Sequence, residues 1–156
     1  MEQRINVFEK SRGVLKAMSG LSIYIANSPV EQSLLNLVSY RVSQINGCAY
    51  CLDMHSKDLR AAGESEQRIY VLDAWREAPF YTDRERAALL WAEAVTKCDV
   101  PDEIFEEARK QFSEDELVDL TVLVVATGSY NRLNVSFGTP AGSYQPGQHA
   151  VVQNNH

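Results

Sequence analysis

Apolar residues recur along this chain with the spacing of α-helices. Polar residues that are typical helix caps divide the chain into separate helical segments. One apolar stripe consists of Leu34, Leu35, Leu37, Val38, Val42 and Ile45. Ser28-Pro29-Val30-Glu31 precedes the stripe and combines a capping box with a proline at the first helical position. The pattern therefore predicts a helix from this box to about Ile45, where Asn46-Gly47 ends it.

The same signals predict helices along most of the chain. Residues 4–26 form one or two helices, with Gly20 as a candidate break. Further helices span residues 48–62, 65–76, 82–97, 101–112 and 113–133. Thr82 and Ser113 each begin a capping box, whereas Gly63 and Ala78-Pro79 end helices.

An apolar run within the last predicted helix, Leu120–Ala126, has the β-branched content of a strand. Its position after a capping box favours a buried helix, and no second strand pattern is present to pair with it. The sequence thus predicts an all-α fold with about six to eight helices in one domain, residues 1–137. Residues 138–156, rich in Gly, Pro and Ser, form a tail without regular structure, in which we expect His149 and His156 to be exposed.

Composition and charge narrow the function. The chain has 156 residues, 45% of them hydrophobic and 23% charged, which is typical of a soluble globular protein. Its net charge is −6, and residues 61–120 hold seven basic and sixteen acidic side chains, so no basic stripe is present to bind nucleic acid. The sequence shows neither a signal peptide nor an apolar run long enough to cross a membrane, and we expect a cytoplasmic protein.

Two cysteines and a histidine lie close together at the start of the helix predicted for residues 48–62. Offsets of three and four residues place Cys48, Cys51 and His55 on one helical face. Unpaired backbone N–H groups at a helix N-terminus stabilise a thiolate, and His55 can accept or return a proton. A cysteine pair at this spacing can close a disulfide after modest adjustment. The pattern indicates a reactive dithiol, which could reduce a peroxide or exchange disulfides with a partner protein.

Other interpretations of the cysteine pair stay open on spacing alone. A zinc site would need a fourth ligand, and Cys98, His149 and His156 are the remaining thiol and imidazoles. Both cysteines could also be small buried side chains without chemistry. A thioredoxin fold would need a strand and a sheet around the pair, which the helical pattern does not supply. We expect no metal and no cofactor.

The segment Arg41–Tyr70, RVSQINGCAYCLDMHSKDLRAAGESEQRIY, resembles the alkylhydroperoxidase D-like core of the carboxymuconolactone decarboxylase superfamily. The resemblance includes the Cys-x-x-Cys-x-x-x-His spacing. It continues in WREAPFYTDRERAALLWAEAVT, NRLNV and GTPAGSYQP, so that it covers residues 10–146. It implies an all-α fold whose protomers assemble into homo-oligomers, often trimers or hexamers.

The resemblance also implies a thiol-dependent peroxidase. In the family's scheme, Cys51 attacks hydrogen peroxide or an organic hydroperoxide, Cys48 resolves the product as a disulfide, and His55 joins a proton relay. A thiol protein or a small thiol then supplies electrons. Family members that act as decarboxylases lack the paired cysteines. The alternative is a protein of the same fold that exchanges disulfides or senses redox state without reducing peroxides.

One position departs from the family's pattern. Its peroxidases carry a relay glutamate twelve residues before the first cysteine, and this chain has Asn36 there, which cannot ionise. Glu93, among apolar neighbours in WAEAVT, is the candidate replacement, and burial would require a partner or a raised pKa for its carboxyl group. An exposed helix glutamate is the other interpretation. Tyr40 and Tyr50 are candidate donors near the site, and a packing role is the favoured interpretation of both.

Overall fold

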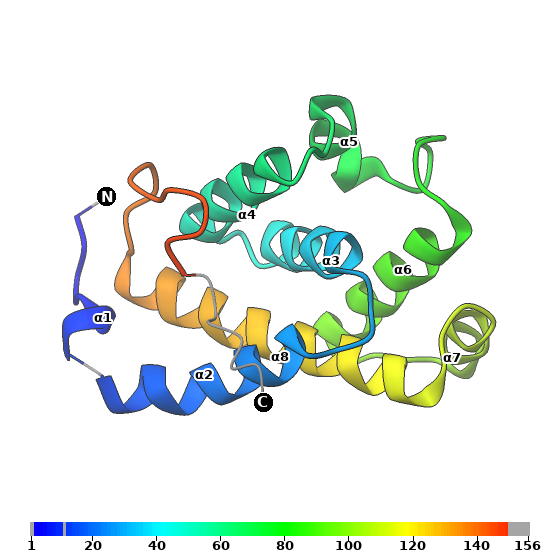
Figure 1. Cartoon of the computed structure of the whole chain (residues 1–156), viewed down its shortest axis with the longest axis horizontal. Helices are drawn as coiled ribbons and strands as arrows, with labels where there is room; N and C mark the ends of the chain where they lie inside the picture. Colours follow the sequence, from blue (N-terminus) through cyan, green and yellow to red (C-terminus); the bar gives the residue numbers. More distant parts are fainter. Residues whose placement is uncertain (1, 11, 150–156) are drawn as a thin grey trace.

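The computed structural model describes residues 2–10 and 12–149. In these ranges the chain forms eight α-helices and one 3-10 helix, with no strand (Figure 1). The α-helices are α1 (Val7–Lys10), α2 (Arg12–Ala26), α3 (Gln32–Ile45), α4 (Ala49–Ala61), α5 (Glu66–Val71), α6 (Asp83–Lys97), α7 (Asp102–Arg109) and α8 (Glu114–Phe137). The 3-10 helix, η1, covers Leu72–Ala74. The all-α prediction is confirmed.

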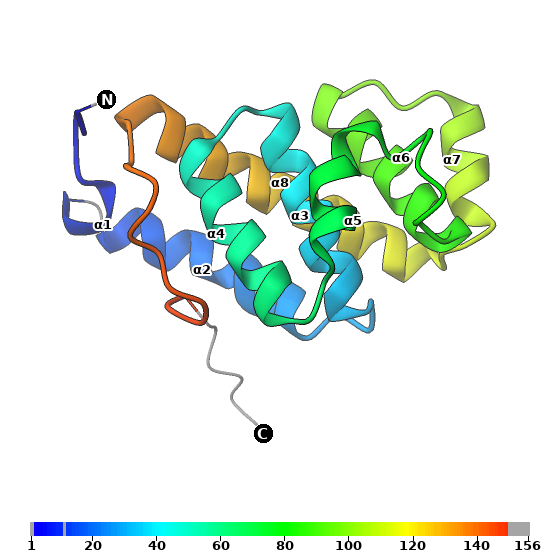
Figure 2. The same ribbon diagram turned by 90° about the horizontal axis from the view of Figure 1, so that it is seen from above.

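Helix α3 lies at the centre of the arrangement and packs against α4, α6 and α8 (Figure 1). Helix α2 runs along α8, while α7 packs on α6 and α8. Helix α1 and the end of α8 lie at one end of the molecule, and α6 and α7 lie at the other (Figure 2). The site described below lies at the end formed by α1, α2, α4 and α8.

The run Leu120–Ala126 is helical, as predicted, and most of it is buried, although Val125 is 52% exposed. Leu120 and Val124 are at most 3% exposed, and they pack in the main core with Leu34 and Val38 of α3. Burial removes apolar surface from water at about 25 cal/mol per Å². This stabilisation outweighs the modest helix propensity of β-branched residues.

Two of the three predicted capping boxes form. Thr82 accepts a hydrogen bond from the backbone of Glu85 at 3.2 Å, and the carboxylate of Glu85 accepts one from the backbone of Thr82 at 2.8 Å. Ser113 and Glu116 make the equivalent pair at the start of α8. Each box satisfies two backbone donors that the helix itself leaves unpaired.

The predicted box at Ser28 does not form, and α3 begins at Gln32 instead. The Ser28 hydroxyl donates a hydrogen bond to Asp119 of α8 at 2.5 Å, and the Glu31 carboxylate pairs with Arg84 of α6 at 2.9 Å. Distant partners thus take both side chains that would have closed the box. The prediction of the helix start was wrong by about one turn for this reason.

Other boundaries differ in detail. Gly20 lies inside α2 and does not break it. The helix that Ser65 caps ends at Val71 and continues as the 3-10 turn η1. Helix α7 ends at Arg109 rather than near residue 112, and α8 continues to Phe137, where Gly138 adopts a left-handed conformation with φ 66°. These shifts leave the order of the helices as predicted.

Residues 139–149 contain no helix or strand, which agrees with the expectation for the tail. This segment, hereafter the C-terminal strap, is nevertheless held on α4. Lys57 donates hydrogen bonds to the backbone carbonyls of Gly142 at 3.2 Å and Tyr144 at 3.0 Å. The Tyr144 hydroxyl donates to the Asp58 carboxylate at 2.9 and 3.0 Å. His156 lies outside the described residues.

Over the described part of the chain, no helix combines the length and apolar character that crossing a bilayer would require.

Candidate active site

The turn between α3 and α4 positions the cysteine pair. Gly47 has φ 64°, and its N–H donates to the carbonyl of Gln44, while the N–H of Cys48 donates to the carbonyl of Ser43. These two bonds form a Schellman motif, which ends a helix and favours glycine at the left-handed position. Cys48 then caps the N-terminus of α4, so the second helix begins one residue after the turn.

Cys48 and Cys51 are joined in a disulfide, with Cα atoms 5.3 Å apart. Both residues are 1% exposed. The backbone N–H of Cys51 donates to the sulfur of Cys48 at 3.3 Å, so the cap contact involves the redox pair itself. Cys51 is in the first turn of α4, where the helix dipole and free N–H groups favour an anion.

A pocket of about 690 Å³ opens beside Cys51. Its walls come from α1, α2, α3, α4, α8 and the C-terminal strap. The apolar part of the wall includes Phe8, Leu15, Ile25, Met54 and Leu123. Cys51 and His55 line the pocket, whereas Cys48 is not among the lining residues. A molecule in the pocket therefore meets Cys51 and not Cys48.

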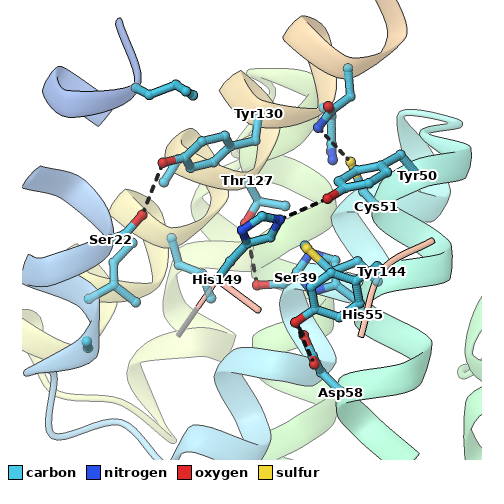
Figure 3. Close-up of a pocket in the computed structure, with 18 of the residues that line it drawn as sticks. Ser22, Ser39, Tyr50, Cys51, His55, Asp58, Thr127, Tyr130, Tyr144 and His149 are labelled. Carbon is cyan, nitrogen blue, oxygen red and sulfur yellow. Dashed lines mark hydrogen bonds between the residues drawn. The ribbon is translucent and has the colours of Figure 1, made fainter. Parts of the chain in front are cut away.

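His55 lies one helical turn after Cys51 and borders the same pocket (Figure 3). Its side chain is half-buried, and burial lowers the pKa of His55 from 6.5 to about 4. The imidazole is therefore neutral at pH 7 and has a nitrogen lone pair available. The spacing predicted Cys48, Cys51 and His55 on one helical face; Cys51 and His55 agree with it, whereas Cys48 is the N-cap residue and does not line the pocket.

Two asparagines of α8 support the site from the opposite side. The Asn134 amide donates a hydrogen bond to the sulfur of Cys51 at 3.5 Å. Asn131 is 1% exposed; its amide donates to Ser43 at 3.1 Å, and its carbonyl oxygen accepts from Asn46 at 2.9 Å. Asn131 thus holds the turn that precedes Cys48, and Asn134 reaches the sulfur directly.

Of the two interpretations of Glu93, the buried one agrees with the structure, but Glu93 does not line the pocket. It accepts hydrogen bonds from Arg41 and Trp75 at 2.8 Å and from Arg76 at 2.7 Å. Burial alone would raise the pKa of Glu93, but the hydrogen bonds from Arg76, Trp75 and Arg41 outweigh it and lower the pKa. A carboxylate occupied by three donors away from the pocket has no proton to relay, so we assign it no step in the mechanism below.

Asn36, in the position of the family's relay glutamate, is hydrogen-bonded to Gln32 at 2.9 Å on the same helix. The structure shows a further contact at the pocket that the spacing of the cysteines did not predict. Tyr50 is a pocket residue, and its hydroxyl is 2.9 Å from Nε2 of His149 in the C-terminal strap. His149 is exposed as expected, but it also lines the pocket (Figure 3).

Sequence reasoning missed Asn134 and His149 as site residues. Asn134 follows Asn131 by three residues in a largely apolar helix, and two buried amides on one face are a signal of a polar site. His149 has no comparable local signal, because its contacts depend on how the strap crosses the molecule. Among the described residues, no three His, Cys, Asp or Glu side chains converge as metal ligands.

The fold and the site together define a helical protein with a buried Cys-x-x-Cys pair beside a mostly apolar pocket. Residues 13–94 match the model of the carboxymuconolactone decarboxylase family. This match covers more than half of the chain, and the chain therefore belongs to that family. The resemblance to its alkylhydroperoxidase D-like branch is confirmed by the relatives below.

Uncharacterized protein YdfG of Bacillus subtilis is 39% identical over 146 residues, which are 92% of this chain and 99% of YdfG. Alkyl hydroperoxide reductase AhpD of Mycobacteroides abscessus is 40% identical over 70 residues, covering 41% of this chain and 40% of AhpD. The crystal structure of ATU0492 from Agrobacterium tumefaciens, a protein of unknown function named as a candidate antioxidant defence protein AhpD, superposes with a TM-score of 0.88. It is 41% identical and covers 92% of this chain and 100% of ATU0492.

Proposed function

We propose that this protein is a thiol-dependent peroxidase that reduces hydrogen peroxide or organic hydroperoxides through the Cys48–Cys51 dithiol. The observation that carries the proposal is the asymmetry of the pair: Cys51 lines the pocket, and Cys48 lies behind it within disulfide reach. Of the two cysteines, a peroxide in the pocket therefore meets Cys51. The AhpD relatives, which match over part of their length, support the same chemistry.

The first step needs a thiolate at Cys51. The N-terminus of α4 stabilises the negative charge, and the Asn134 amide can donate to it. His55, neutral at pH 7, accepts the proton that the Cys51 thiol releases. A Cys51 thiolate would in turn favour the protonated form of His55, because opposite charges one helical turn apart stabilise each other.

The thiolate then forms a bond to one peroxide oxygen while the O–O bond breaks. Cys51 becomes a sulfenic acid, and the other oxygen leaves with a proton as water or an alcohol. Cys48 attacks the sulfur of Cys51, expels water and closes the disulfide seen in the structure. A small dithiol or a thiol protein returns two electrons and two protons to restore the pair.

Stopped-flow measurement of thiol oxidation tests this proposal. Hydrogen peroxide and an organic hydroperoxide are each mixed with the reduced wild type, Cys48→Ser and Cys51→Ser. We expect rapid oxidation of the wild type, rapid single-thiol oxidation in Cys48→Ser and a loss of at least about 100-fold in Cys51→Ser. A wild-type rate equal to that of a free cysteine would overturn the proposal.

A further inference from the structure

The hydroxyl of Tyr50 and the imidazole of His149 meet inside the pocket although they are 99 residues apart in sequence. Tyr50 directly precedes Cys51 in the first turn of α4. Figure 3 shows the tyrosine ring beside Cys51, with its hydroxyl directed at His149. The pair therefore forms part of the wall that surrounds the reacting sulfur.

Both rings are fixed by aromatic neighbours. His149 stacks on Phe8, with ring centroids 5.9 Å apart and ring planes 6° from parallel. The ring centroids of His149 and Tyr144 are 5.5 Å apart. Phe8 also contacts the Tyr50 ring at 6.4 Å. The Tyr144 hydroxyl is held by Asp58 of α4. These contacts leave Nε2 of His149 directed at the Tyr50 oxygen.

The proposed reaction has an unassigned proton. Breaking the O–O bond of an organic hydroperoxide releases an alkoxide oxygen, which is a poor leaving group unless an acid protonates it. His55 carries the proton of Cys51 after the first step and is the competing acid, so an unchanged rate ratio in Tyr50→Phe would assign this step to His55. Asn36 cannot donate an ionisable proton, and Glu93 does not line the pocket.

We propose that Tyr50 is the acid that protonates the leaving oxygen, and that His149 positions the Tyr50 hydroxyl and restores its proton. This inference rests on the proposed peroxidase function. In the productive tautomer, Nε2–H of His149 donates to the Tyr50 oxygen, which turns the tyrosine's own proton towards the pocket. His149 is exposed, so its ring can exchange a proton with solvent.

The step balances in atoms and charge. The Cys51 thiolate bonds to the terminal oxygen of ROOH, the O–O bond breaks, and the RO oxygen takes the proton of Tyr50. The products are ROH and the Cys51 sulfenic acid. Tyr50 recovers a proton from Nε2 of His149, a solvent proton at Nδ1 replaces it, and His55 returns to solvent the proton that it took from Cys51. The sulfur is oxidised and the peroxide is reduced by two electrons.

Leaving groups of different basicity separate proton donation from a structural role. The oxidation rate of reduced full-length protein is measured with tert-butyl hydroperoxide, which releases a basic alkoxide, and with peracetic acid, which releases acetate and needs no proton. We expect Tyr50→Phe to lose about 100-fold with the hydroperoxide and less than about threefold with the peracid. His149→Gln should shift the ratio of the two rates in the same direction, by about tenfold.

Tyr130→Phe is the matched control, because it removes another hydroxyl from the same pocket, one that contacts Ser22. It should leave the ratio of the two rates as in the wild type.

Equal slowing of both oxidants in Tyr50→Phe, or no slowing, overturns the proposal. If Tyr50→Phe does not fold, the ratio in His149→Gln decides by the same criterion. A wild type that reacts with neither oxidant overturns the peroxidase function and this inference together, whereas a reactive wild type with an unchanged ratio in the variants overturns this inference alone.

Discussion

The side-chain amide of Asn134, on α8, donates a hydrogen bond to the sulfur of Cys51, on α4, at 3.5 Å. The two residues are 83 positions apart in sequence, and both are buried. A neutral disulfide gains little from such a contact, but a thiolate in the reduced protein would gain a charge-assisted hydrogen bond. The contact links the last helix to the chemistry at the start of α4.

Asn134→Ala should therefore reduce the fraction of Cys51 present as thiolate. Loss of a hydrogen bond to a charged group costs about 1.5–3 kcal/mol, which corresponds to at least about tenfold less thiolate near neutral pH. The rate of alkylation by iodoacetamide, measured across pH in a Cys48→Ser background, reports this fraction. Ser129→Ala on the same helix is the control. An unchanged alkylation profile in Asn134→Ala would show that the amide does not stabilise the thiolate.

Gly47 and Gly20 should respond to alanine in opposite directions. Neither position has an atom within 4 Å of an added Cβ, so crowding plays no part. Gly47 has φ 64°, and Gly47→Ala should destabilise the fold by about 1–2 kcal/mol. Gly20 lies within α2, and Gly20→Ala should stabilise it by about 0.5–1 kcal/mol. Chemical denaturation of both variants tests the prediction, and changes of the same sign would contradict it.

The partial burial of His55 should make the free energy of unfolding depend on pH. Its pKa falls from 6.5 in the unfolded chain to about 4 in the folded protein, so between these values the unfolded chain binds more protons. The neutral imidazole therefore contributes about 2–3 kcal/mol to the free energy of unfolding. This contribution is fully present above pH 6.5 and is lost as the pH falls towards 4. Denaturant unfolding at several pH values should show that the free energy of unfolding falls less between pH 6.5 and 4 in His55→Asn than in the wild type. Parallel curves would contradict the buried neutral imidazole.

Glu93→Gln should affect stability rather than peroxide reduction. Three donors, Arg41, Trp75 and Arg76, bind the Glu93 carboxylate, and removing its charge leaves the largely buried Arg41 without that counterion. Breaking a buried pair costs about 3–5 kcal/mol, and retention of one amide oxygen should limit the loss to the lower end. A Glu93→Gln variant of unchanged stability but slower peroxide reduction would instead support the relay role that the sequence suggested.

The C-terminal strap should limit access of a protein reductant to the disulfide. Both cysteines are 1% exposed, and the strap is held on α4 by the Tyr144–Asp58 hydrogen bonds. Tyr144→Phe removes a hydrogen bond worth about 1 kcal/mol and should loosen the strap. Reduction of the disulfide by thioredoxin should therefore become about threefold to tenfold faster. Reduction by dithiothreitol, which is small enough for the pocket, should change less. Equal acceleration with both reductants would contradict a gating role.

The sequence was most informative where an element depends on its own neighbours. Thr82 and Ser113 form their capping boxes because both partners lie within one turn. Helical spacing likewise puts Cys51 and His55 on one face, whereas Cys48, predicted to share that face, is the N-cap residue and does not line the pocket.

Long-range partners account for what the sequence did not reveal. Ser28 contacts Asp119, 91 residues away, and so gives up its local cap. The path of the strap depends on contacts of Gly142 and Tyr144 with α4. The hydrophobic periodicity of the sequence does not predict these contacts. The sequence left open whether Glu93 is buried or exposed, because its three donors come from α3 and from the segment after η1 and give no local signal. Whether the homo-oligomer implied by the resemblance forms stays a prediction.

The most direct test of the account asks which sulfur receives the peroxide oxygen. Reduced Cys48→Ser and Cys51→Ser are each treated with one equivalent of an organic hydroperoxide in the presence of a 1,3-dione that traps sulfenic acids, and the adduct is mapped by mass spectrometry. We predict rapid, near-complete trapping on Cys51 in Cys48→Ser, little trapping on Cys48 in Cys51→Ser, and a Cys48–Cys51 bridge in the wild type. Equal trapping on either cysteine, or trapping no faster than on exposed Cys98, would contradict a peroxidase whose reacting sulfur is Cys51.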